Sequence, residues 1–99
     1  MKPIRNETVL VSTTSLEVAA DLEGLEKRTD LIIRNTSPNA VDIITLSLGR
    51  NAAVANAGIV LRQNEIWMSS TDISNPAWSG AIQAICATIN GQLSIMEKS

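Results

Sequence analysis

The side chains that carry out most enzymatic chemistry are scarce in this 99-residue chain. It has no histidine and a single cysteine, so it lacks both an imidazole base and a set of zinc or iron–sulfur ligands. A serine–lysine pair would need a buried amine, whereas Lys2, Lys27 and Lys98 lie near a terminus or in a charged turn. We therefore predict that the protein is not an enzyme.

Oxygen ligands and phosphate-binding loops are also poorly represented. Asp21, Glu23 and Glu26 lie close together in DLEGLE, but their spacing does not match an EF-hand loop, and a solvated acidic turn is the better interpretation. The spacing of the carboxylates does not single out two that the fold must bring together, as a glycosidase site would need. The five glycines are scattered singly at predicted turns and form no glycine-rich phosphate-binding loop. The sequence predicts no catalytic residues, no cofactor and no metal.

Three side chains remain as candidates for a role beyond ordinary surface. Cys86, in AIQAICATI, is predicted to be a buried small hydrophobic residue, because no imidazole is present to activate it. Trp67 lies inside a strand-like run, which favours packing in the core or between subunits. Trp78 lies in the loop NPAWSG, where burial and a surface role in binding are about equally expected.

Charge and hydropathy exclude other classes of partner. Eight Lys and Arg residues against ten Asp and Glu residues give a net charge of -2, and no basic stripe could follow a phosphate backbone. No apolar run approaches the length that spans a membrane, and TVLVSTTS is too short and polar for the core of a signal peptide. We expect synthesis in a reducing cytoplasm, with neither nucleic acid nor membrane as a partner.

The chain is organised as short apolar runs separated by turn residues every eight to twelve positions or so. Aromatic residues make up only 2% of it, so the core should be aliphatic. We predict one all-β domain, an antiparallel β-sandwich or jelly-roll-like fold of about seven to eight strands. Residues 28–99 form its expected core, and residues 1–27 an N-terminal strand or arm region.

The first two runs are TVLVSTT and SLEVAA. In TVLVSTT, Val9, Val11 and Thr13 share one face. SLEVAA reads as a short strand, although Leu16, Leu22 and Leu25 also allow a helical turn through residue 27.

Four further runs follow in two pairs. The first pair, DLIIRNT and VDIITLSL, is joined by NTSPNA, whose small turn residues favour a hairpin-like return. In VDIITLSL, we expect Ile44, Leu46 and Leu48 to face the core, and Thr45 and Ser47 to lie on a more polar face. The next two runs surround a tight turn at residues 63–64, with Ile66 and Met68 on one side and Trp67 on the other.

The strongest local turn signal is Asn90-Gly91, between ATI and QLSI. This dipeptide favours a type I′ hairpin, because both central positions of that turn need positive φ. We expect strands at about 81–89 and 92–97, although Ile82, Ile85 and Ile89 also match a helical spacing.

The segment that contains Val9 and Val11 has two readings. It lies between a polar N-terminus with Pro3 and the charged stretch ADLEGLEKR, so it could be an arm that adds to a sheet edge in its own chain or in a neighbour. An ordinary first strand within one protomer is about as well supported. As an arm it would contribute contacts to a neighbouring subunit or to a larger assembly, which makes Val9 and Val11, with Trp67 and Trp78, the candidate interface residues.

The order of features from residue 28 to 97 resembles small β-sandwich structural proteins of tailed-bacteriophage particles. In that pattern a basic residue opens an apolar strand closed by Asn-x-Ser, a Gly-x-x-Leu strand turns over a small loop ending in Glu, and the last strand ends near a glutamate. The matching positions here are Arg28, Asn35, Ser37, Gly58, Leu61, Glu65, Trp78, Gly80 and Glu97. Many such sequences have Pro-Gly before the glutamate, where this chain has Gln63-Asn64.

The resemblance implies a non-enzymatic virion component. Its first expectation is a capsid decoration or cement protein that binds the shell through oligomeric contacts, with a trimer suiting three-fold positions. A head-fibre or tail-associated protein is also within the pattern. The alternative function is a carbohydrate- or receptor-binding module at the tail, which would use the same fold and expose Trp78. Among the candidate functions, a small enzyme is the least favoured.

Overall fold

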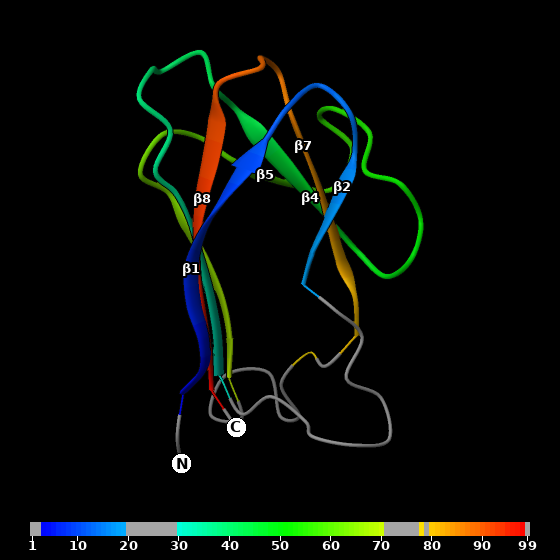
Figure 1. The fold of residues 1–99 in the computed structure, drawn as a ribbon. Helices are drawn as coiled ribbons and strands as arrows, with labels where there is room; N and C mark the ends of the chain where they lie inside the picture. Colours follow the sequence, from blue (N-terminus) through cyan, green and yellow to red (C-terminus); the bar gives the residue numbers. More distant parts are fainter. Residues whose placement is uncertain (1–2, 20–29, 71–77, 79, 99) are drawn as a thin grey trace.

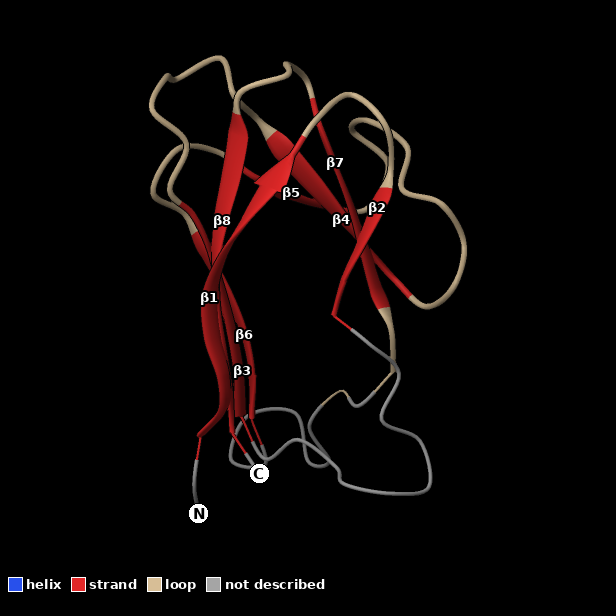
Figure 2. Cartoon of the chain, in the orientation of Figure 1, coloured by secondary structure: helices blue, strands red, loops and turns tan. Residues whose placement is uncertain are grey.

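Two four-stranded antiparallel sheets pack face to face in the computed structural model of the protein (Figures 1 and 2), which describes residues 3–19, 30–70, 78 and 80–98. One sheet has the strand order β1-β8-β3-β6 and the other β2-β7-β4-β5. The strands are β1 (Pro3–Val11), β2 (Leu16–Ala19), β3 (Asp30–Asn35), β4 (Ile44–Leu48), β5 (Ile59–Leu61), β6 (Ile66–Ser70), β7 (Ile82–Cys86) and β8 (Gly91–Lys98).

The strand pairing is nested from the ends of the chain towards its middle. β1 pairs with β8, β2 with β7, β3 with β6 and β4 with β5, all antiparallel. Such a chain is one long hairpin folded at β4–β5 and rolled up, and the additional pairs β3–β8 and β4–β7 close the roll into two sheets. This is the jelly-roll form of the β-sandwich, so the predicted fold class is confirmed.

The core lies between the sheets and is aliphatic, as the composition predicted. β8 and β3 alternate strictly between buried and half-exposed positions over most of their length, as expected of strands with one face on a core. The largest fully buried apolar side chains are Leu31, Ile33, Ile44, Leu46, Ile82, Leu93 and Ile95. Cys86 is buried among them, as predicted.

The nested topology gathers alternate connections at one end of the sandwich. The loops 12–15, 36–43 and 87–90 each join a strand of one sheet to a strand of the other, and they lie together at the top of Figure 1. We call this the loop end.

The predicted hairpins were wrong in their pairing. Among the described strands, β4 and β5 are the only consecutive pair that is hydrogen-bonded. NTSPNA, the turn at residues 63–64 and Asn90-Gly91 each carry the chain across to the opposite sheet. Local turn residues reverse the chain equally well in both cases, so they do not report which sheet the next strand joins.

Gly91 also differs from the predicted type I′ turn. Among the described residues, positive φ occurs at Asn56, Asn64, Gly49 and Gly58, and neither Asn90 nor Gly91 is in that group. Gly91 is instead the buried first residue of β8. A Cβ added there would meet the Val11 carbonyl oxygen and the Cys86 Sγ at 2.7 Å or less. The glycine is therefore required by close packing and not by backbone conformation.

Several predictions of strand and face are confirmed. Residues 16–19 form a strand, and the helical alternative for the positions after them lies outside the described residues. In β6, Ile66 and Met68 are exposed while Trp67 packs against the core. The strand predicted at 81–89 ends earlier, at Cys86.

The predicted polar face of β4 needs one correction. Thr45 is buried, because the loop at residues 49–58 covers it: Asn56 N donates to Thr45 Oγ1 at 3.1 Å. Leu48, predicted to face the core, is 40% exposed at the end of its strand.

Candidate functional site

The four candidate interface residues do not form one exposed site. Val9 and Val11 lie on β1 and Trp67 on β6, which are opposite edges of the same sheet. Val11 is 1% exposed and belongs to the core, while Val9 and Trp67 are half-buried against it. β1 pairs with β8 of its own chain from Pro3 to Val11, which is the ordinary-first-strand reading of this segment.

Trp78 is held in place by packing and hydrogen bonds. Its backbone N donates to Ser69 Oγ at 2.9 Å, and its indole Nε1 donates to the Ala81 carbonyl at 3.2 Å. The ring packs against the core and over Gly80, where an added Cβ would come within 2.6 Å of it. The indole nitrogen and one approach to the ring are thus already used within the protein.

Asn35, one of the residues that carries the resemblance, is a buried hub for three segments of chain. Its Nδ2 donates to the carbonyls of Asp42 and Leu61, both at 2.9 Å, and its Oδ1 accepts from Ser37 N at 3.0 Å. Its backbone carbonyl accepts from Asn64 N at 2.8 Å. The side chain therefore fixes the 36–43 loop against the end of β5, and the backbone carbonyl holds the turn before β6.

The next residues extend this anchoring to β8. Thr36 N donates to the Gln92 carbonyl at 3.0 Å, and Gln92 N donates to Ser37 Oγ at 2.9 Å. Glu65, at the end of the neighbouring turn, accepts from Arg62 N through Oε1 at 2.6 Å. Asn35, Ser37 and Glu65 thus serve to hold loops in one geometry.

The 87–90 loop is fixed to the 36–43 loop by a second buried group. Thr88 Oγ1 donates to Asp42 Oδ1 and accepts from Asn90 N at 3.1 Å. Asp42 Oδ2 also accepts from Asn39 N at 3.1 Å. Because both loops are tied together at Asp42, the exposed side chains they carry have a well-defined position.

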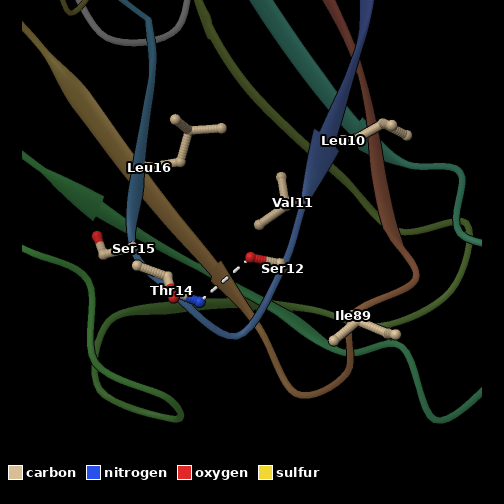
Figure 3. Close-up of a pocket in the computed structure, with 7 residues that line it drawn as sticks. All are labelled: Leu10, Val11, Ser12, Thr14, Ser15, Leu16 and Ile89. Atoms are coloured by element: carbon tan, nitrogen blue, oxygen red, sulfur yellow. Dashed lines mark hydrogen bonds between the residues drawn. The ribbon is translucent and has the colours of Figure 1, made fainter.

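The loop end carries an apolar surface around a shallow hollow of about 200 Å³. Leu10, Leu16 and Ile89 border it and are 75%, 43% and 77% exposed. Figure 3 shows them coming from the end of β1, the start of β2 and the loop between β7 and β8. We call these three residues the apolar rim.

Small hydroxyl side chains line the rest of the hollow together with Val11. Ser12 Oγ accepts from Thr14 N at 3.4 Å, and Ser15 Oγ accepts from Ala53 N at 2.8 Å. The lining contains no acidic, basic or thiol group. The arrangement suits contact with an apolar side chain of a partner, with hydroxyls available for hydrogen bonds at its margin.

Sequence reasoning did not identify the apolar rim. Leu10 appeared only as part of an edge-forming segment, and Ile89 was assigned to a strand that ends three residues earlier. The local signal was a large apolar residue immediately beside turn residues, at Ile89-Asn90. Its significance depends on the pairing of β1 with β8, which brings distant parts of the chain together.

Within the described ranges, no three His, Cys, Asp or Glu side chains lie close enough to hold a metal ion. The same part of the chain has no helix of the length and hydropathy needed to cross a membrane. No protein-family model, curated protein or solved structure matches the chain.

Proposed function

We propose that the protein is a non-enzymatic structural component of a tailed-bacteriophage virion, most specifically a capsid decoration or cement protein. It binds the shell through the apolar rim, in an assembly that contains more than one copy. The observation that carries the proposal is the exposure of Leu10, Leu16 and Ile89 together. Leu10 and Leu16 lie at the ends of paired strands, and Ile89 lies on a loop that the bond between Thr88 and Asp42 holds in place.

Exposed apolar side chains on an ordered backbone favour association for two reasons. Burying each of them on a partner removes apolar surface from water, at about 25 cal/mol per Å². The two strand ends and the 87–90 loop are already ordered, so binding costs less conformational entropy than it would for a mobile segment. A surface of this kind suits permanent docking onto another protein.

The resemblance of residues 28–97 supports the phage assignment. Jelly rolls are frequent in viral capsid proteins, although they also occur in lectins and cupins, so the fold alone does not select a function. The anchoring roles of Asn35, Ser37 and Glu65 give the matching positions a structural reason.

The alternative, a carbohydrate- or receptor-binding module of the tail, depended on an exposed Trp78. Stacking on a sugar needs an open aromatic face. Trp78 is half-buried and packed over Gly80, so the decoration-protein reading is favoured.

Rebinding to phage particles tests the proposal. Particles lacking the protein are mixed with purified protein and sedimented, and the bound protein is quantified. Leu10→Asp and Ile89→Asp should each lower the affinity at least tenfold, because a carboxylate would be buried at the contact. Leu48→Asp is the matched control, since Leu48 is 40% exposed and lies opposite Ile82, at the end of β4 and β7 away from the loop end.

Circular dichroism spectra and melting temperatures of all three variants should match those of the parent protein. Particles that bind no parent protein would contradict the proposed function. Equal binding by Leu10→Asp, Ile89→Asp and Leu48→Asp would contradict the assignment of the contact to the apolar rim.

A further inference from the structure

β6 differs from the other three sheet edges of the described structure. An open strand edge invites pairing with another chain, and proteins block it with Pro, charge, bulges or short strands. β1 contains Pro3 and a register shift, β2 has four residues with a register shift, and β5 has only three residues. β6 is a regular five-residue strand, IWMSS, without Pro, charge or bulge.

The outer edge of β6 also carries its two large exposed side chains. Asn35 N donates to the Glu65 carbonyl, so by the antiparallel alternation Ile33 and Trp67 exchange the next hydrogen bonds. The backbone N–H and C=O groups of Ile66 and Met68 then point away from β3. Their side chains, 51% and 47% exposed, stand on the outer face of the sheet.

We propose that β6 pairs with β6 of a second copy of this chain, antiparallel about a two-fold axis at Trp67. In this register Ile66 faces Met68 of the other copy, and the same contact occurs twice. The alternative register, with Met68 facing Met68, would place Ile66 opposite Ser70. The first register is preferred because it matches apolar side chains in both contacts.

The surrounding residues are compatible with this pairing. In one protomer Met96, Ile32 and Met68 are already neighbours across β8, β3 and β6. The second copy would continue this apolar row with its own Ile66. Among the described residues of the outer face, the cation nearest to the β6 edge is Arg34 of β3, which lies opposite Ile66 of β6. The two copies of Arg34 would be at least about 14 Å apart, beyond the screening length of about 8 Å at physiological salt.

The area involved sets the expected affinity. Pairing one five-residue strand buries less than the roughly 1,200 Å² of a stable complex. The isolated pair should therefore be weak, populated at high protein concentration or when copies are held close together. This inference does not depend on the phage assignment, because it concerns the purified protein alone.

Cysteine cross-linking tests both the pairing and its register. Hydrogen-bonded antiparallel pairs have Cα atoms about 5.5 Å apart, which suits a disulfide. Mixing Ile66→Cys protein with Met68→Cys protein under mild oxidation should give a covalent dimer containing one chain of each. Each variant alone should give much less, and the parent protein none, because Cys86 is buried.

A second measurement uses charge at the same edge. Met68→Lys should abolish the concentration-dependent dimer seen by sedimentation velocity, whereas Thr8→Lys, exposed on the opposite edge strand β1, should leave it unchanged. Absence of the mixed disulfide, with a monomer at all concentrations, would overturn the proposal. A disulfide formed by Met68→Cys alone, as readily as in the mixture, would overturn this register.

Discussion

Asn35 shows how one polar side chain can organise a small aliphatic sandwich. Its amide donates twice and accepts once within a fully buried site, and it connects segments that lie in opposite sheets. The Asn-Thr-Ser sequence could be recognised as a turn, but its long-range partners could not, because Leu61 is 26 positions away. The structural role of this motif therefore became visible only with the fold.

Replacing Asn35 with Ala should lower the free energy of unfolding by about 3 kcal/mol, because two carbonyls and one N–H would lose their buried partner. Asn35→Asp should be at least as harmful, since its carboxylate would face the two carbonyls. Urea denaturation measures both. The exposed Asn39→Ala is the control, because Asn39 contacts Asp42 through its backbone N–H and carbonyl, and both groups remain in the variant. A loss below about 0.5 kcal/mol for Asn35→Ala would contradict the hub role.

Gly91 gives a test that separates close packing from turn conformation. Gly91→Ala should destabilise the fold by about 2 kcal/mol or more, because the new Cβ would collide with the Val11 carbonyl and with Cys86. Gly91→Val should be worse. Asn90→Ala should change the stability of the fold little, whereas in a type I′ turn this substitution would also destabilise the fold. Thermal unfolding of the three variants decides between the two accounts.

At the scale of elements, the sequence predicted most strands and few of their partners. Alternating apolar residues and turn signals located β1, β3, β4, β6 and β8 because these patterns are local. The pairing of β1 with β8 joins the two ends of the chain, and no local pattern encodes it. The choice between hairpin and crossover at Asn90-Gly91 likewise depends on the pairing of β8 with β1 and β3, which are distant in the sequence.

The β1 strand provides a prediction at this scale. Deleting residues 1–14 should prevent folding, because β1 pairs with β8 along its length and Val11 is part of the core. Circular dichroism and gel filtration of the truncated protein measure this. A folded monomer that has lost only its ability to assemble would instead support the arm reading of the segment.

At the scale of the whole molecule, the surfaces proposed for contact lie in different places. The apolar rim is at the loop end, and the β6 edge is at the far side of the sheet from β1. A protein that docks on a shell and also contacts another copy needs two such separate surfaces. The position of the exposed apolar residues could not be predicted from the sequence, because it depends on how the strands pair.

Electron cryomicroscopy of the phage particles to which we assign this chain, prepared with and without its gene, is the most direct test of the proposed decoration function. We expect the parent particles to carry additional density on the capsid surface that fits the eight-stranded sandwich, with Leu10, Leu16 and Ile89 facing the shell. That density should be absent from the particles without the gene. Identical capsid surfaces in the two maps would contradict the proposed decoration function.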